Sequence, residues 1–124
     1  MRHLLVVDDE PLILEVAQLS LEMVGGWEVS TATSGLEALS KAATGRPDAI
    51  LMDVMMPGMD GPTTCRRLAD DPQTSDIPVI LLTAKVQPSE QRQWALLPVA
   101  GVLAKPFDPM RLPTEVEDLL GWSE

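Results

Sequence analysis

Hydrophobic positions along the chain gather into five short runs, separated by longer stretches in which apolar residues recur at helical spacing. The first run, Leu-Leu-Val-Val at 4–7, is continuously apolar, which is typical of a strand buried on both faces. The second run alternates between apolar and polar residues, and this pattern also favours a strand. The predicted strands therefore occupy residues 4–7, 27–32, 49–52, 77–82 and 99–103.

The stretches between these strands carry helix signals. Pro11 suits the first position of a helix over residues 12–24, which a pair of glycines ends. The apolar stripe of this helix comprises Ile13, Val16, Ala17, Ser20 and Val24. Ser34, with a glutamate three residues later, has the spacing of a capping box and predicts a second helix. Asp60 is a predicted cap for a third.

Two further helices are predicted, one near residues 89–95 and one that begins after the prolines at 109 and 113. Strand and helix thus alternate about five times, which is the pattern of a parallel sheet covered by helices on both faces. The predicted class is α/β. Residues 1–124 are expected to form one domain, large enough to build a core without disulfide or metal support.

Composition excludes several classes of partner. The formal net charge is −10, from 19 acidic and 9 basic residues, and no stripe of Lys and Arg is present to bind nucleic acid. No apolar run approaches the roughly 20 residues that cross a bilayer. Cys65 is the one cysteine, which excludes a disulfide framework and predicts a packing role in a helix. We therefore expect a cytoplasmic protein that binds neither nucleic acid nor membrane.

Polar side chains follow four of the five predicted strands. Asp8 and Asp9 come after the first strand, Asp53 after the third, Thr83 after the fourth and Lys105 after the fifth. Ligands of open α/β sheets bind outside the carboxyl ends of the strands. The sequence therefore predicts that these residues, although distant along the chain, form one site.

The residue types at this site suit phosphoryl transfer. Clustered carboxylates repel one another unless a hard cation joins them, and oxygen ligands suit Mg²⁺ or Mn²⁺. The ammonium group of Lys105 and the hydroxyl of Thr83 can contact an incoming phosphoryl group. A carboxylate beside the metal can itself be the nucleophile and form an aspartyl phosphate, for which Asp53 is the candidate.

Four segments together resemble a known family. They are Val-Val-Asp-Asp-Glu at 6–10, Asp-Val-Met-Met-Pro-Gly-Met-Asp-Gly at 53–61, Leu-Thr-Ala-Lys at 82–85 and Lys-Pro-Phe at 105–107. With these segments in this order, the whole chain resembles a receiver domain of the response regulators of two-component systems. The resemblance implies a flavodoxin-like, doubly wound fold with the strand order 2-1-3-4-5. It also implies a signalling domain that catalyses only its own phosphorylation and its own dephosphorylation, and no reaction of other substrates.

The resemblance implies that Asp53 accepts a phosphoryl group from a phosphohistidine on a sensor histidine kinase or a phosphotransfer protein, and that the site then hydrolyses it slowly. Thr83, Lys105 and the backbone N–H of Ala84 would contact the phosphoryl oxygens. The bond from Lys105 to Pro106 would be cis, which aims the lysine inward.

By the same resemblance, Asp9, Asp53 and the backbone carbonyl of Met55 would hold Mg²⁺, and Asp8 would assist through a bound water. Met55 and Lys85 occupy positions from which the family tunes the lifetime of the phosphate. The site would thus contain both the metal and the phosphate acceptor.

The chain departs from the family pattern on its output side. Val102 stands three positions before Lys105, where the family usually has an aromatic residue that swings inward on phosphorylation. A valine has a stiff χ1 and cannot make that movement, so switching would run through backbone motion or a remodelled face. The segment before it is also unusual and contains Pro88, Trp94 and Pro98. The expected output is binding of a downstream protein, or dimerisation, through the C-terminal helix-strand-helix face of a stand-alone domain.

Two alternative functions remain open from the sequence. A degenerate receiver would bind its partners without phosphorylation, which the valine at 102 would permit. A haloacid-dehalogenase-type phosphatase also uses an aspartate nucleophile and Mg²⁺, but it needs a second aspartate two residues after the first. Here Glu10 follows Asp8 at that spacing, and Met55 follows Asp53.

Overall fold

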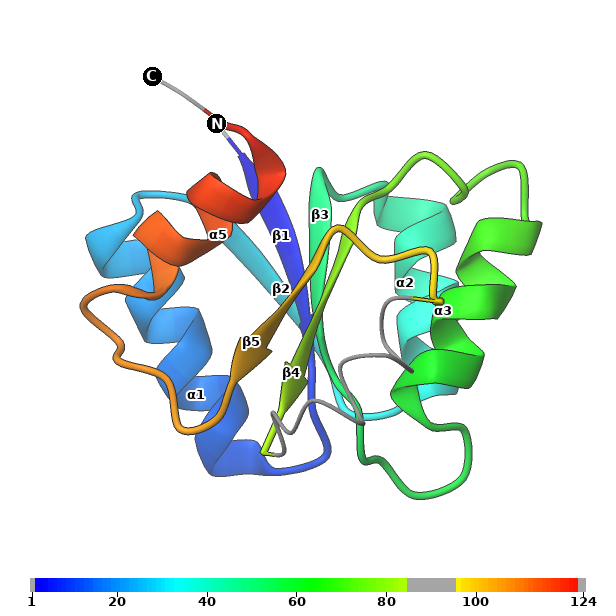
Figure 1. The fold of residues 1–124 in the computed structure, drawn as a ribbon, viewed down its shortest axis with the longest axis horizontal. Coiled ribbons are helices and arrows are strands. Elements are labelled where there is room, and N and C mark those ends of the chain that lie inside the picture. The colour runs from blue at the N-terminus through cyan, green and yellow to red at the C-terminus, as the bar shows by residue number, and fades with distance from the viewer. Residues whose placement is uncertain (1, 85–95, 123–124) are drawn as a thin grey trace.

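The computed structural model describes residues 2–84 and 96–122 and arranges five parallel strands in one sheet (Figure 1). The strand order is β2-β1-β3-β4-β5, which confirms the predicted topology. The strands are β1 (His3–Val7), β2 (Glu28–Ala32), β3 (Ala49–Asp53), β4 (Val79–Thr83) and β5 (Gly101–Ala104). The predicted helix at 89–95, together with Lys85, Pro88 and Trp94, lies outside the described residues.

Helices cover both faces of the sheet, as predicted. Figure 1 shows α1 and α5 against one face and α2 and α3 against the other. Their bounds are α1 (Pro11–Leu19), which continues as the π-helix η1 (Ser20–Val24), α2 (Gly35–Gly45), α3 (Gly61–Asp70) and α5 (Leu112–Leu120). Within the described ranges, no helix is long and apolar enough to cross a membrane.

Strand β1 shows how the sheet divides the core in two. Leu4 and Val6 point to the face covered by α1 and α5, and they pack in a cluster with Leu112. Leu5 and Val7 point to the opposite face and pack in the cluster that contains Cys65 of α3. Because successive side chains of a strand alternate between faces, a continuously apolar strand supplies both cores.

Both predicted N-caps are present. The Ser34 hydroxyl accepts a hydrogen bond from the Glu37 backbone N–H at 3.1 Å, and the Asp60 carboxylate accepts one from the Thr63 N–H at 2.8 Å. The reciprocal bond of the first cap is displaced by one residue, because Glu37 accepts from the Thr33 N–H rather than from that of Ser34. These caps fix where α2 and α3 begin at the carboxyl edge of the sheet.

The predicted stripe of the first helix is partly wrong. The buried residues of this stretch are Leu14, Ala17, Ser20 and Leu21. Val24, which a period of 3.6 residues places beside Ser20, is instead 45% exposed. From Ser20 the chain forms a π-helix, in which the Gly25 N–H bonds to the Ser20 carbonyl five residues earlier. This wider turn moves Val24 off the buried face.

Two tryptophans that are distant along the chain pack on each other. The rings of Trp27 and Trp122 meet edge to face with their centroids 5.5 Å apart. The guanidinium of Arg2 lies 4.1 Å from the Trp122 ring centroid, a cation–π contact. This cluster joins the two ends of the described chain at the amino-terminal edge of the sheet.

Candidate functional site at the carboxyl ends of the strands

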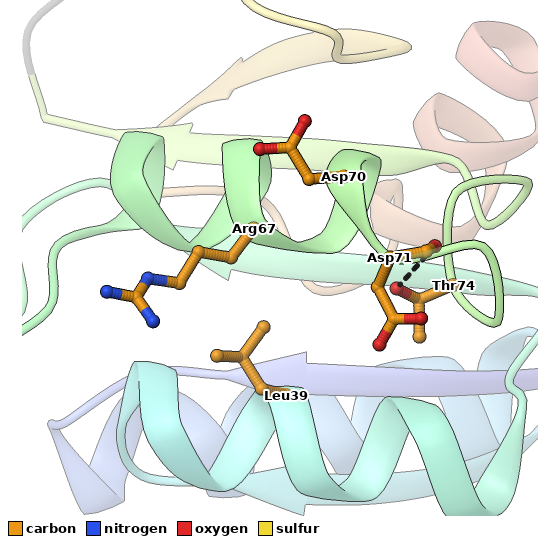
Figure 2. A pocket seen from close by; sticks show the side chains of 5 residues that line it. All are labelled: Leu39, Arg67, Asp70, Asp71 and Thr74. Atoms are coloured by element: carbon orange, nitrogen blue, oxygen red, sulfur yellow. Dashed lines mark hydrogen bonds between the residues drawn. The ribbon is translucent and has the colours of Figure 1, made fainter.

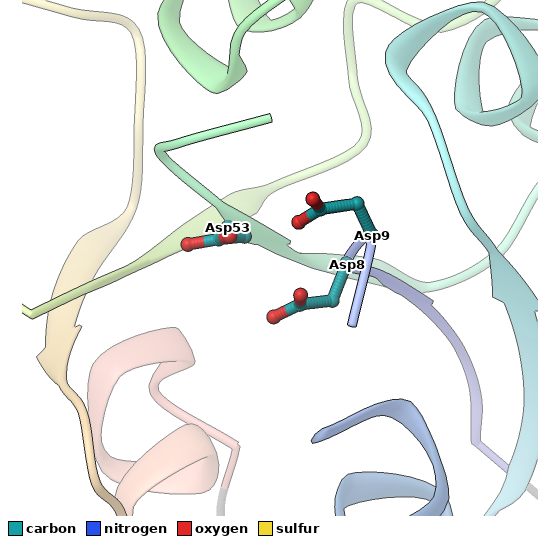
Figure 3. Close-up of side chains that lie close together, drawn as sticks. All are labelled: Asp8, Asp9 and Asp53. Carbon is teal, nitrogen blue, oxygen red and sulfur yellow. The ribbon is translucent and has the colours of Figure 1, made fainter. Parts of the chain in front are cut away.

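Three carboxylates meet where two neighbouring strands end. Asp8 and Asp9 follow β1, and Asp53 is the last residue of β3, which pairs directly with β1. One carboxylate oxygen from each of the three lies within 4.8 Å of the others (Figure 3). Asp8 is completely buried and Asp53 is 4% exposed, whereas Asp9 is the most exposed of the three. The structure therefore brings together the three acids that the sequence predicted.

Lys105, which directly follows β5, contacts two of these three carboxylates. Its ammonium nitrogen lies 2.8 Å from Oδ2 of Asp8 and 3.1 Å from Oδ1 of Asp53. The backbone places it there, because its N–H donates to the carbonyl of Thr83 at 2.8 Å, just beyond the last pair of β4 and β5. The Lys105–Pro106 bond is cis, as predicted.

Burial and charge act in opposite directions on the groups of the site. Burial raises the pKa of Asp53 and the charge of Asp8 adds to this, although the hydrogen bond from Lys105 opposes both. Burial would lower the pKa of Lys105, but its bonds to Asp8 and Asp53 outweigh burial and raise that pKa. Among the described residues, this cluster holds three carboxylates and the single ammonium of Lys105, so their ionised forms carry an excess of negative charge. A divalent cation would offset this excess.

Among the other predicted site residues, Thr83, Ala84 and Met55 belong to the part of the chain that the structure describes and lie next to this cluster. Thr83 ends β4 and is 4% exposed, and the exposed Ala84 follows it. Met55 has its side chain 75% exposed, and its backbone N–H bonds to the Asp53 carboxylate, which lowers the pKa of Asp53. The main chain of Met55 thus lies at the site and its side chain lies in solvent.

Val102 lies in β5, where it is paired with Leu81 of β4. It is half-buried and packs against the core cluster beneath α2 and α3. The position three residues before Lys105 is therefore filled by a small aliphatic side chain that already contacts the core.

Gly61, the last residue of the motif at 53–61, has a steric role that the sequence did not predict. A Cβ atom at Gly61 would lie 2.5 Å from the carbonyl oxygen of Asp53 and 3.0 Å from Cα of Val54. Its N–H donates to the Val54 carbonyl at 3.0 Å. The loop after Asp53 can therefore close onto the start of α3 only if this residue lacks a side chain. An aspartate cap followed by glycine is the signal in the sequence that could have indicated this.

A groove away from the site runs between α2 and α3 and has a volume of about 330 Å³ (Figure 2). Leu39 of α2 faces Arg67 of α3 across it, and at its other end the Thr74 hydroxyl makes a weak 3.5 Å contact with the Asp71 carbonyl beside its main bond to the Leu68 carbonyl. It contains none of the residues that the sequence predicted to be functional. The predicted residues instead gather at the carboxyl ends of the strands.

Comparison with known proteins agrees with this arrangement. Residues 4–117 match the family model of the response regulator receiver domain. The chain is 38% identical over 120 residues to the DNA-binding dual master transcriptional regulator RpaA of Synechocystis, covering 97% of this chain and 49% of RpaA. It is 46% identical over 120 residues to the response regulator PleD of Caulobacter vibrioides, covering 94% of this chain and 26% of PleD.

The solved structures give the same result for the fold. The chemotaxis response regulator CheY4 of Vibrio cholerae superposes with a TM-score of 0.89 at 33% identity, covering 96% of this chain and 98% of that one. The chain spans half or less of the length of the two curated relatives, but nearly all of this solved structure. On these findings, the chain belongs to the response regulator receiver domains of two-component signal transduction.

Proposed function

We propose that residues 1–124 form a single receiver domain in which Asp53 accepts a phosphoryl group from a phosphohistidine. The donor would be a sensor histidine kinase or a phosphotransfer protein. The observation that supports this most strongly is the position of Lys105, whose ammonium contacts Asp8 and Asp53 at once. The acceptor is thus surrounded by the charges that phosphoryl transfer requires.

Mg²⁺ fits the donor set of this site. The carboxylates of Asp8, Asp9 and Asp53 are hard oxygen ligands within 4.8 Å of one another, and the backbone carbonyl of Met55 would complete the set. Mn²⁺ prefers the same ligands and would replace it. When bound, the cation neutralises charge between the carboxylates and the phosphoryl oxygens.

Each residue of the site has its own proposed role in phosphoryl transfer. A carboxylate oxygen of Asp53 forms a bond to phosphorus while the bond from phosphorus to the histidine nitrogen breaks, and the nitrogen keeps the electron pair. Lys105, now close to Asp53, would move its contact to a phosphoryl oxygen. The Thr83 hydroxyl and the Ala84 N–H would bind the other oxygens. Catalysis is mainly positioning and electrostatic stabilisation.

Slow loss of the phosphoryl group would occur at the same place. Water attacks phosphorus, the bond to Asp53 breaks, and inorganic phosphate leaves while the carboxylate is restored. Met55 follows the acceptor by two residues and is 75% exposed, and its side chain is proposed to limit the approach of that water. Met55 is therefore a position at which the lifetime of the phosphate can be set, and Lys85 is proposed to act with it.

Output is proposed to run through β5 and α5, by binding a downstream protein or a second copy of the chain. Val102 cannot make the aromatic movement of the family, since its side chain is small and already packs on the core. Movement of Thr83 would instead be transmitted through the backbone pairing of β4 and β5. The same valine favours the second candidate function, a receiver whose partner binding does not depend on phosphorylation.

Intact mass spectrometry after incubation with acetyl phosphate tests the chemistry without a kinase. We expect one phosphoryl adduct that needs Mg²⁺, survives acid, is lost in base and is absent from Asp53→Asn. Partner binding that persists in Asp53→Asn would favour the second function. If neither acetyl phosphate nor a phosphorylated histidine kinase gives an adduct, the proposed phosphate acceptor is wrong.

A further inference from the structure

One buried hydroxyl far from the carboxylates makes an unusual long-range contact. The buried polar residues of the described chain are Asp8, Ser20, Asp53, Thr64, Thr74 and Thr83. Thr64 and Thr74 donate to carbonyls four and six residues earlier, within α3 and the turn that follows it. The Ser20 hydroxyl instead donates to the carbonyl of Pro109, 89 residues along the chain. Ser20 therefore joins two elements, whereas the two threonines stabilise one.

Ser20 lies where α1 becomes the π-helix η1. Its carbonyl accepts from the Gly25 N–H five residues later, at 3.3 Å, and its side chain is 4% exposed. Single π turns within helices occur frequently at functional sites. A buried hydroxyl costs free energy unless it is hydrogen-bonded, and an alanine would fit the same space without that cost. What Ser20 adds over an alanine is therefore its bond to Pro109.

The bond holds the segment 105–111, which connects β5 to α5. This segment starts at Lys105, whose N–H is fixed to the carbonyl of Thr83. It ends in a turn closed by Asp108, whose carbonyl accepts from the N–H groups of Arg111 and Leu112 at 3.0 and 2.9 Å. Figure 1 shows this segment running beside α1 before it enters α5. Ser20 anchors it at Pro109, between its two ends.

We propose that Ser20 is a positioning residue for phosphoryl transfer, because its hydroxyl holds segment 105–111 against the start of η1 and so keeps the Lys105 ammonium between Asp8 and Asp53. The inference rests on the proposed function. Without the bond, the Pro109 carbonyl loses its partner and the segment gains conformational freedom. Small displacements of a positioning group reduce rates strongly, since the gain from proximity depends on geometry.

The test compares Ser20→Ala with two variants. Ser20→Thr keeps a hydroxyl at the same place. Thr74→Val is the matched control, because it also removes a buried hydroxyl that donates to a carbonyl, but in the turn after α3. Three quantities are measured: the initial rate of phosphorylation by acetyl phosphate, the Mg²⁺ concentration at half-saturation, and the NMR signal of the Lys105 side chain. Circular dichroism establishes that each variant is folded.

We expect Ser20→Ala to lower the phosphorylation rate about tenfold, which corresponds to ~1.4 kcal/mol. Its Mg²⁺ half-saturation should be unchanged, since the three carboxylates are untouched, and its Lys105 signal should shift. Ser20→Thr should restore most of the rate. Thr74→Val should lose stability and keep both the rate and the Lys105 signal.

Two results would overturn the inference. One is a Ser20→Ala rate equal to that of Thr74→Val, and the other is a Lys105 signal that Ser20→Ala leaves in place. If the wild type is not phosphorylated at all, the proposed function fails by itself. In that event the Lys105 signal still decides whether Ser20 positions the lysine. If Ser20→Ala does not fold, Ser20→Cys, which keeps only a weak donor, is measured in its place.

Discussion

The Lys105 ammonium lies 2.8 Å from the carboxylate of Asp8, although 97 positions separate the two residues along the chain. Asp8 is completely buried, and the Lys105 side chain is 12% exposed. A buried carboxylate without a counter-charge is strongly unfavourable, so this pair connects the stability of the domain to the integrity of its site. The parallel sheet makes the contact possible, because β1 and β5 end at the same edge.

Removal of the Lys105 ammonium should therefore lower the stability of the domain. We expect Lys105→Met to lower the free energy of unfolding by about 3 kcal/mol without Mg²⁺, as is found when one partner of a buried pair is lost. Lys41→Met is the control, because Lys41 pairs with Glu37 at the surface, at 3.4 Å, where such pairs contribute less than about 1 kcal/mol. Urea titration measures both. Equal losses in the two variants would contradict the structural role of the buried pair.

Asp53→Asn should stabilise the domain when Mg²⁺ is absent. Burial raises the pKa of Asp53, so the folded state binds its proton more tightly than the unfolded state does. Stability from this group is present below the ordinary aspartate pKa and is lost as pH rises through the raised value. The advantage of Asp53→Asn, measured by thermal unfolding, should thus be present at pH 7 and shrink toward pH 4.

Mg²⁺ should reverse that advantage. A cation bound only by the folded state adds about 2.7 kcal/mol of stability at one hundred times its Kd, and Asp53→Asn would remove one of its proposed ligands. We expect Mg²⁺ to raise the melting temperature of the wild type much more than that of the variant. Equal increases in both proteins would show that Asp53 does not bind the cation.

Gly61→Ala should destabilise the domain by about 1–3 kcal/mol, since the new Cβ would lie 2.5 Å from the Asp53 carbonyl oxygen. The phosphorylation rate should fall as well, because the loop after Asp53 must shift. Gly45→Ala is a matched control in α2, where the nearest atom to a new Cβ is 3.8 Å away. It should be neutral or stabilise the domain by up to about 1 kcal/mol. If urea unfolding shows Gly45→Ala to be less stable than Gly61→Ala, the close contact between position 61 and the Asp53 carbonyl is refuted.

Cys65 should be inert in the folded domain. It is 1% exposed, and burial raises the pKa of its thiol to about 12. Thiolate is the reactive form, so alkylation at pH 8 should proceed only through unfolding. Its rate, followed by mass spectrometry, should rise steeply near the urea midpoint. Rapid labelling without urea would contradict the burial of this residue.

Much of the site could be predicted because, in a parallel sheet, the residues that follow each strand lie at the same edge of the sheet. The carboxyl ends of successive strands meet at one edge, so Asp8, Asp53 and Lys105 could be placed together once the strands were recognised. The grouping of the three acids proposed to bind Mg²⁺ follows from the same rule. Strand order came from resemblance, since no local pattern in these strands specifies which neighbours pair.

Other features depend on contacts that no local pattern carries. The π turn at Ser20 breaks the period of 3.6 residues, so the exposure of Val24 was predicted wrongly. The bond from Ser20 to Pro109 joins segments 89 residues apart, and nothing in either segment indicates the other. The requirement for glycine at position 61 arises from the path of the Asp53 backbone, which is known only once the loop is built.

The most direct test of Asp53 as the phosphate acceptor is to identify the phosphorylated residue. The wild-type domain is incubated with acetyl phosphate and Mg²⁺ and then treated with borohydride, which reduces an aspartyl phosphate to homoserine. Peptide mass spectrometry locates the change. We expect homoserine at position 53 alone, and only when Mg²⁺ is present. Homoserine at Asp8 or Asp9, or an unreduced Asp53 in a protein that has gained a phosphoryl group, would contradict it.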